Sequence, residues 1–186
     1  MGKTTFSGPV RSLAGFNPSG YANVVNLPED GSYDLTSELH GGRIVTLTGA
    51  ATTVLTLPAI NGTDPVDETT PGQVSNFGLS FRVMLSDSVT SLTVGTTGTD
   101  EFFGGLTIDT ESVATLAASG NTFFAQDGDG LDTITITSAA TGWEPGGVLE
   151  FVAINKDVSG SDVFRWCLTG SKLLGIGTVT TPLSAS

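Results

Sequence analysis

The clearest pattern in the chain is an alternation of apolar and polar positions between residues 77 and 85. Polar Ser80 and Arg82 fall between the apolar positions, which are Phe77, Leu79, Phe81, Val83 and Leu85. An apolar residue at every second position indicates a β-strand with one buried face. An earlier run, residues 52–56, also suits a strand, and the Leu-Pro-Ala step after it ends that strand because proline cannot donate a ladder hydrogen bond. We expect the two strands to form a hairpin around the long loop 61–73.

Shorter runs with the same period predict further strands, at residues 32–36, 43–48, 91–94 and 133–137. In the last of these we expect Ile134 and Ile136 to face the core. The run 146–156 is apolar on nearly both faces, which is typical of a central strand, and the run 162–170 predicts its hairpin partner. Residues 112–120 leave a short helix and a strand both open.

These elements and the composition together indicate an all-β protein. The 186 residues include 25 glycines and a single cysteine, and no long apolar segment has a helical period. A chain of this length can bury about 70% of the surface of its unfolded state, so it needs no disulfide or metal to fold. We predict a β-sandwich of jelly-roll type with about eight to ten strands, formed by residues 29–186.

The composition of residues 1–28 indicates an extended arm. Glycine and proline recur there too often for a regular element, yet the segment has more apolar residues than a solvated tail carries. It has no acidic residue, whereas the rest of the chain holds all 19. The arm either packs across its own domain or reaches a partner or neighbouring subunit, in which case the candidate contacts are Lys3, Phe6, Val10, Arg11, Leu13, Phe16 and Tyr21.

The charge of the chain argues against one class of function. The formal net charge is -12, and the seven lysines and arginines are scattered along the sequence. Nucleic-acid phosphates require clusters of such residues, so we expect no nucleic-acid binding. The sequence has neither an apolar run of about 18 residues nor the core of a signal peptide, so we expect a soluble protein with no membrane partner.

Aromatic residues outside the arm suggest a second kind of surface. Phe102 and Phe103 precede two glycines, and exposed rings at these positions and at Trp143 would complement the apolar face of a sugar. The alternative is that one ring of the pair fills the core and the other covers a seam.

Three aspartates, Asp127, Asp129 and Asp132, suggest calcium, because hard oxygen ligands on a glycine-rich loop suit that ion. Their spacing fits neither an EF-hand nor a calcium-binding β-roll, so an Asp-Gly turn before a strand is the main interpretation, and we predict no cofactor. The single histidine, His40, has no metal-ligand pattern around it and suits a turn or the surface. Cys167 suits a buried small residue rather than a nucleophile.

Sequence motifs for catalysis do not occur in the chain. It has no phosphate-binding loop, dinucleotide fingerprint, hydrolase elbow or zinc cluster. Paired carboxylates for glycoside hydrolysis stay open, because such pairs assemble across strands and leave no local pattern. We expect a protein that is not an enzyme.

Several segments, in their order along the chain, resemble the head decoration (cement) proteins of tailed bacteriophages. They are TTVLTLPAINGTD at 52–64, FRVMLSDSVTSLTV at 81–94, DTITITSAATGWEPGGVLEFVAINK at 132–156, and FRWCLTG followed by GIGTVTTP within 164–182. The opening KTTFSGPVRSLAGF at 3–16 is similar to an amino-terminal arm of virion proteins from marine and cyanobacterial phages.

This resemblance implies a non-enzymatic virion protein that is made in the host cytoplasm and sits on the outer surface of the capsid. Its implied partners are the major capsid protein and further copies of itself, as a homotrimer that holds neighbouring capsid subunits together. The alternative is a receptor- or glycan-binding module of a phage head fibre or tail.

Overall fold

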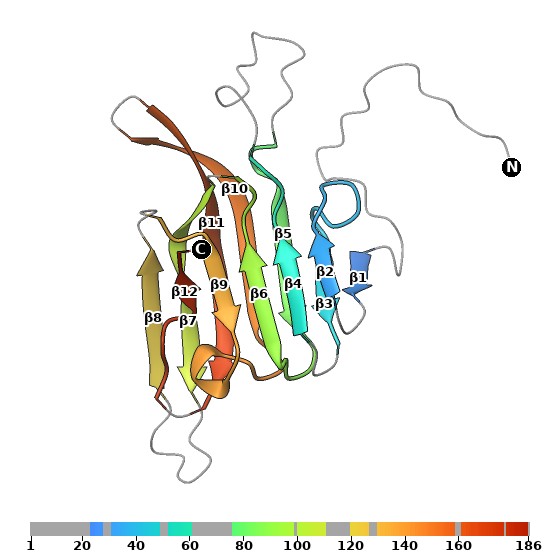
Figure 1. Ribbon diagram of the computed structural model, residues 1–186, viewed down its shortest axis with the longest axis vertical. Helices are drawn as coiled ribbons and strands as arrows, with labels where there is room; N and C mark the ends of the chain where they lie inside the picture. Colours follow the sequence, from blue (N-terminus) through green and yellow to red (C-terminus); the bar gives the residue numbers. More distant parts are fainter. Residues whose placement is uncertain are drawn as a thin grey trace, which may run out of the picture.

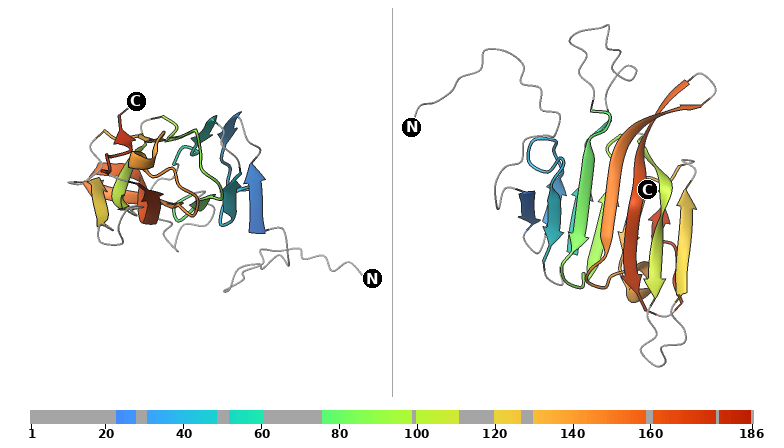
Figure 2. Two further views of the ribbon diagram at one scale, coloured as in Figure 1. Left: turned by 90° about the horizontal axis from the view of Figure 1, so that it is seen from below. Right: turned by 180° about the vertical axis from the view of Figure 1, so that it is seen from behind.

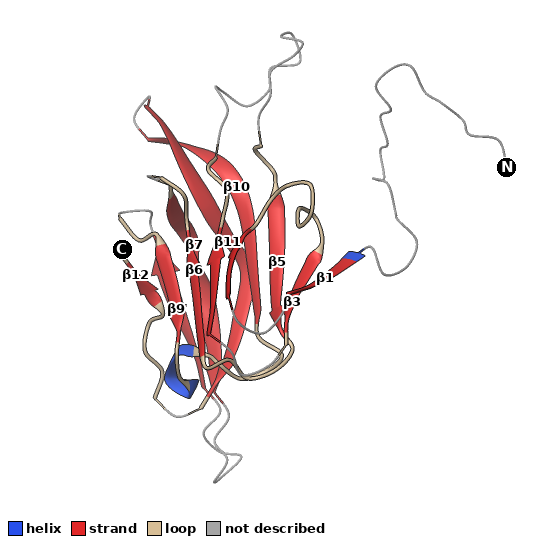
Figure 3. Cartoon of the chain, turned by 45° about the vertical axis from the view of Figure 1, so that its right-hand side comes forward, coloured by secondary structure: helices blue, strands red, loops and turns tan. Residues whose placement is uncertain are grey.

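The alternating segments form strands in the computed structural model, which describes residues 23–27, 31–48, 52–60, 76–98, 100–110, 120–126, 130–158, 161–176 and 178–185. The strands are β1 (Val24–Leu27), β2 (Gly31–Asp34), β3 (Ile44–Leu47), β4 (Thr52–Thr56), β5 (Ser80–Leu85), β6 (Ser91–Gly95), β7 (Glu101–Thr110), β8 (Gly120–Gln126), β9 (Thr133–Ile136), β10 (Val148–Val158), β11 (Ser161–Gly175) and β12 (Leu183–Ser184). A short 3-10 turn, η2 (Ala139–Thr141), follows β9, and the described residues contain no α-helix (Figure 3).

The strands form two mixed sheets that lie face to face (Figure 1, Figure 2). The seven-stranded sheet has the order β1-β3-β5-β10-β11-β7-β8, and the five-stranded sheet has the order β12-β9-β6-β4-β2. Buried side chains from both sheets belong to one hydrophobic cluster, which fills the space between them. The all-β prediction is confirmed, and the two layers fit a sandwich arrangement.

The first six strands alternate between the two sheets, so the chain winds as three successive coils. β1, β3 and β5 are parallel neighbours in the seven-stranded sheet, and β2, β4 and β6 are parallel neighbours in the five-stranded sheet. Each coil contributes one strand to each sheet, as in a solenoid, where a repeat contacts only its neighbours. We call residues 24–95 the coil half of the body, and residues 101–184 the closing half.

Like residues stack on one another in the coil half because the register aligns them. Across β1, β3 and β5, the two rows of register partners that face the core are Val25, Val45 and Val83, and Leu27, Leu47 and Leu85. Except for the half-buried Val25, these side chains are at most 5% exposed. Such rows of aliphatic side chains are the packing unit of a sheet, and they hold successive coils in register.

The closing half extends both sheets with longer and mostly antiparallel strands. β10 pairs with β5 on one side and with β11 on the other, so it is the middle strand of the seven-stranded sheet, and β10 and β11 form a hairpin. The predictions of a central strand and of its hairpin partner are both confirmed. In the five-stranded sheet β9 pairs with β6, and Ile134 and Ile136 are fully buried as expected.

The predicted hairpin of β4 and β5 is wrong. β4 belongs to the five-stranded sheet and β5 to the seven-stranded sheet, so the two strands lie in different layers. The apolar alternation marked both strands correctly. A period of two reports which side of a strand is buried, but it does not report which strands pair.

The jelly-roll prediction is not confirmed. A jelly roll consists of antiparallel Greek keys, whereas the four neighbouring pairs of the coil half, and β7 with β11, are parallel. The twelve described strands also outnumber the eight to ten expected, because β12 is too short to leave a pattern and β1 was counted with the arm. β1 lies inside the segment assigned to the arm, so the body includes Val24–Leu27. Of residues 112–120, only Gly120, the first residue of β8, is described.

Candidate interaction surface

The pair of phenylalanines singled out from the sequence divides between the core and the surface. Phe102 is fully buried, and its ring centroid lies 5.7 Å from that of Phe151, so it cannot offer a ring face to a sugar. Phe103 is the next residue of β7 and therefore points to the outer face of the seven-stranded sheet, where it is half-buried. The alternative in which one ring fills the core is correct for Phe102.

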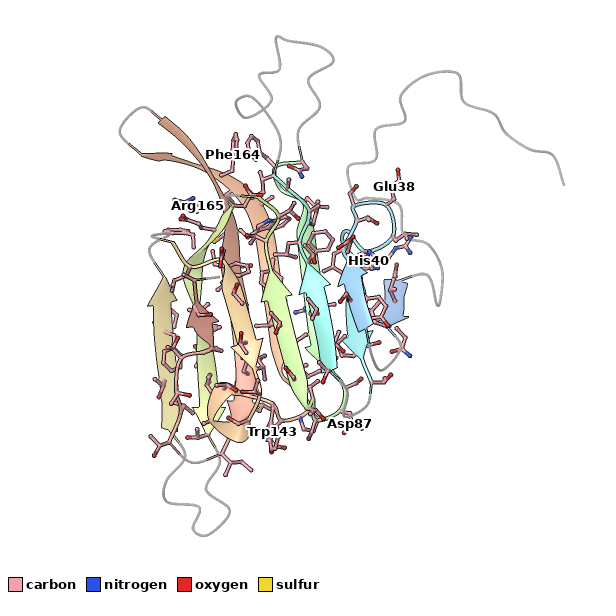
Figure 4. The ribbon with its side chains drawn as sticks, in the orientation of Figure 1. Glu38, His40, Asp87, Trp143, Phe164 and Arg165 are labelled. Carbon is pink, nitrogen blue, oxygen red and sulfur yellow. The ribbon has the colours of Figure 1, made fainter. Side chains whose placement is uncertain are left out.

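Trp143 does not join Phe103 in one site. Figure 4 shows Trp143 at the lower end of the body. It forms an isolated bridge with Leu174, which is the register partner of Asp109 at the far end of β7 from Phe103. At about 3.3 Å per residue, the two rings are separated by roughly 20 Å along the sheet. The indole Nε1 of Trp143 donates a hydrogen bond to Glu144 Oε1 at 3.0 Å, and the ring is half-buried.

Most of the other predicted site residues lie outside the described residues. These are Lys3, Phe6, Val10, Arg11, Leu13, Phe16 and Tyr21 of the arm, and Asp127 and Asp129 of the proposed calcium loop. Asp132 is described: its Oδ1 accepts a hydrogen bond from the Thr133 hydroxyl at 3.0 Å as the chain enters β9. No group of three histidine, cysteine or carboxylate side chains suited to a metal occurs among the described residues.

His40 lies in the turn between β2 and β3, as predicted, but it is buried rather than on the surface. Its Nδ1 accepts a hydrogen bond from the Thr36 backbone N–H at 3.0 Å. Burial lowers the pKa of the imidazole, and the nearby Arg43 lowers it further against the opposing effect of the Thr36 bond. Cys167 is half-buried on β11, and burial raises the pKa of its thiol, so it is a poor nucleophile.

The outer face of the seven-stranded sheet carries all four basic side chains that the structure describes. Three of them form ion pairs with carboxylates on neighbouring strands, and Arg82 with Glu150 and Arg165 with Glu101 are also register partners. The pairs are Arg82–Glu150 at 2.5 Å, Arg165–Glu101 at 2.8 Å and Lys172–Asp109 at 2.5 Å. The Arg82 and Lys172 pairs are partly exposed and contribute little to stability, whereas the side chains of Arg165 and Glu101 are only 13% and 24% exposed. Together the pairs set the charge pattern of this face.

The outer face of the five-stranded sheet is different. Within its described strands the only charged side chain is Asp34, and most outward positions carry hydroxyl groups, namely Ser32, Thr52, Thr56, Ser91, Thr93, Thr133, Thr135 and Ser184. The two faces of the body therefore present different chemistry. Recognition of a charged partner by described side chains is possible mainly on the seven-stranded sheet.

A hollow of about 380 Å³ opens on the outer face of the seven-stranded sheet, between β3, β5 and β10. Its polar lining includes Arg43 at the start of β3, Ser80 and Arg82 of β5, Glu150 of β10 and Thr169 of β11. The guanidinium of Arg82 is engaged by Glu150. Among the described residues Arg43 has no ion-pair partner, so it contributes a positive charge that no described carboxylate neutralises.

Sequence reasoning missed this hollow. Arg82 was recognised as a position on the polar side of its strand, but Arg43 and Glu150 carry no local motif. Arg43, Arg82 and Glu150 come together because of the strand register. Ile44, the residue after Arg43, pairs with Arg82, and Arg82 pairs with Glu150. Strand order would have been needed to find them.

No family model matches the chain, and no curated protein or solved structure matches it either. The resemblance to phage decoration proteins therefore stays a prediction. In the described residues, no helix is long and apolar enough to cross a membrane.

Proposed function

We propose that this protein is a non-enzymatic structural component of a phage virion, which binds the outer surface of the capsid as a homotrimer and cements neighbouring major capsid subunits. One observation carries the proposal: the stack of coils ends in two strand edges, and one of them is β1, the strand that follows the arm in the sequence. β1 and β2 are the terminal strands of their sheets, with no described strand on their outer sides. Residues 1–22 lead directly into β1.

Strand edges of this kind are binding sites for extended chains. At such an edge, backbone N–H and C=O groups can pair with an added strand, and native proteins normally cover or blunt such edges. The arm supplies apolar anchors and two basic residues, Lys3 and Arg11, against a body that holds all the carboxylates. A contact formed by the arm, or at the outer edge of β1, would place a neighbouring subunit at the end of the coil half.

Three such contacts in one trimer would act together. Once one protomer is bound, the others are held near their own sites at a high effective concentration, so modest single contacts add up to firm attachment. The proposal does not depend on jelly-roll connectivity, because the coil half already provides a two-layered body in which no described strand lies beyond β1 and β2.

Deletion of residues 1–22 tests the role of the arm, because it leaves β1 intact. We expect the truncated protein to stay folded by circular dichroism, and to lose co-sedimentation with empty heads of the phage whose genome carries this sequence. A full-length variant with Lys3 and Arg11 changed to glutamine separates the charge of the arm from its apolar anchors. Equal attachment of the truncated and full-length proteins would rule out the arm, and a native mass other than three protomers would rule out the trimer.

A glycan-binding module is a second candidate, and one observation on the seven-stranded sheet favours it. Phe123 of β8 is 64% exposed, and its ring covers Gly105, where an added Cβ would lie 2.5 Å from Phe123 Cζ. The ring therefore rests on backbone with its other side toward solvent, which is the arrangement that stacking on a sugar requires. Loss of binding to a glycan array on changing Phe123 to alanine would support this candidate, and unchanged binding would remove it.

A further inference from the structure

The hollow beside Arg43 has the size and the lining of a binding site for a small polar ligand. Its volume of about 380 Å³ lies within the range of ligand pockets in proteins. Ile44 and Val152 add apolar surface to a lining whose polar side chains carry two hydroxyl groups, one carboxylate and two guanidinium groups. The buried rings of Phe81 and Phe151 lie beneath it and are at most 1% exposed, so they offer no stacking surface.

Two glycines with positive φ lie in or next to the lining of the hollow. Gly42, at one edge, has a φ of +66°, and a Cβ added there would meet no atom within 4 Å. Gly170 lies in the bulge of β11 with a φ of +65°, and a Cβ there would lie 2.8 Å from Glu150 Oε2. The second glycine therefore leaves space for the Glu150 carboxylate, which pairs with Arg82 in the hollow.

The charges of the hollow define the ligand that it would accept. Arg43 has no carboxylate partner among the described residues, and the nearby His40 carries no negative charge. No described side chain therefore neutralises the Arg43 guanidinium. A single carboxylate on the ligand would do so through charge-assisted hydrogen bonds. A dianionic phosphate would suit the site less well, because Glu150 lies in the same hollow and would repel it.

The strands around the hollow favour a saccharide over a peptide. β3, β5 and β10 are each paired on both sides, so they have no free backbone edge to which an extended peptide could add. The side chains that remain, Ser80, Thr169 and Glu150, exchange hydrogen bonds readily with sugar hydroxyls. Ile44 and Val152 match the apolar C–H surface of a sugar ring.

The geometry points to a binding site for an acidic sugar: the hollow between β3, β5 and β10 binds a hexuronic acid unit of a polysaccharide, with its carboxylate on Arg43. This site is separate from the arm and from the edges of β1 and β2. It would give the outer face of the protein a ligand of its own, whether or not the protein attaches to a capsid.

Calorimetric titration with trigalacturonate, against the neutral trisaccharide of galactose, tests the site on the full-length protein. The two ligands differ in their carboxylates, so we expect trigalacturonate to bind and the neutral sugar to bind at least tenfold more weakly. Because the protein is itself acidic, binding should be measured at about 0.15 M salt, where long-range repulsion is screened beyond roughly 8 Å.

Arg43→Gln is the decisive variant, and Lys172→Gln is its matched control. Both remove one positive charge from the same sheet face, but Lys172 pairs with Asp109 and lies outside the hollow. We expect Arg43→Gln to weaken trigalacturonate at least tenfold and Lys172→Gln to change it less than twofold, with unfolding temperatures confirming that both variants fold. Equal weakening by the two variants, equal binding of the neutral sugar, or binding of a polyglutamate peptide in place of trigalacturonate would each overturn the proposal.

Discussion

The coil half and the closing half of the body bury their apolar side chains in different ways. In the coil half, short parallel strands repeat the same residue types in register, as in the row Leu27, Leu47 and Leu85. In the closing half the core contains large aromatic rings on long strands, and Trp166 lies with its ring centroid 5.5 Å from that of Phe81 across β10. A stack of coils can end after any repeat, whereas the closing half supplies the remaining strands of both sheets.

The two halves also differ in the chemistry of their surfaces. All three ion pairs of the described residues involve a strand of the closing half, and Arg82–Glu150 lies where β5 of the coil half meets β10. On the outer strands of the coil half, Asn26 Oδ1 instead accepts hydrogen bonds from the Thr46 and Thr48 hydroxyls. The ion pairs of the described residues are therefore concentrated where the halves meet and in the closing half, whereas the strand edges that the proposed function uses lie at the first coil.

Truncation of Phe151 should have the largest effect on stability and tests whether the halves unfold together. Phe151 is fully buried on β10 and pairs in register with Phe81 of the coil half and with Leu168 of β11. We expect Phe151→Ala to lower the free energy of unfolding by about 3–5 kcal/mol, because it removes a core ring and leaves a cavity. The outward neighbour Val152→Ala serves as the control, with a cost of about 1 kcal/mol or less.

Urea unfolding followed by two probes gives the measurement. Both tryptophans, Trp143 and Trp166, belong to the closing half, whereas far-UV circular dichroism reports on all strands. Since β10 is bonded to both β5 and β11, we expect the two transitions to coincide and to shift together in Phe151→Ala. Separate transitions would show that the coil half is an independent folding unit.

Leucine truncations along one row test how the coils depend on their neighbours. Leu47 lies between Leu27 and Leu85, so Leu47→Ala should cost about 2–5 kcal/mol, and Leu27→Ala in the terminal coil should cost about 2 kcal/mol at most. Urea unfolding of both variants, with and without residues 1–22, checks this. Equal costs in the full chain that become unequal after the deletion would show that the arm packs on its own first coil, which is the alternative interpretation of the arm.

A short repeated motif marks the coils in the sequence, but alternation within single strands does not reveal that repeat. The motif V-x-L occurs at 25–27, 45–47 and 83–85, and each copy is a strand of the seven-stranded sheet. The copies are unevenly spaced because residues 61–75 separate β4 from the described chain before β5. A repeat of fixed period is the usual sign of a solenoid, so this insertion hid the repeat.

Strand positions and burial followed from local alternation, whereas the site did not. Phe81, Val83 and Leu85 are buried as their spacing predicted. The ion pairs and the hollow depend on which strands are neighbours, and this is decided by packing between residues far apart in the chain. Grouping Phe102 with Phe103 was a different mistake, because consecutive residues of a strand face opposite sides and local alternation alone separates the two rings.

The smallest effect concerns the seam between the halves, where Asp100 should make stability depend on pH. Its Oδ2 accepts a hydrogen bond from the backbone N–H of Ile60 at 2.7 Å, and this joins the end of the second coil to the start of β7. Burial raises the pKa of the Asp100 carboxyl, against the lowering effects of the Ile60 bond and of Arg165. Because the folded pKa is raised, the stabilising contribution of protonated Asp100 is complete below the unfolded value of 3.8 and is lost as pH rises through the folded value.

Asp100→Asn isolates this contribution, because the amide oxygen still accepts the Ile60 bond and does not ionise. We expect the wild type to gain stability relative to Asp100→Asn as pH falls from about 7 to about 4, measured as the difference in urea unfolding free energy, by less than the core truncations cost. His40 has a lowered pKa and the opposite sign, but it is present in both proteins and cancels from the difference. Asp34→Asn, which removes an exposed carboxylate of β2, controls for net charge. A pH-independent difference for Asp100→Asn would mean that the pKa of the Asp100 carboxyl is the same in the folded and unfolded proteins, which would contradict the raised folded value.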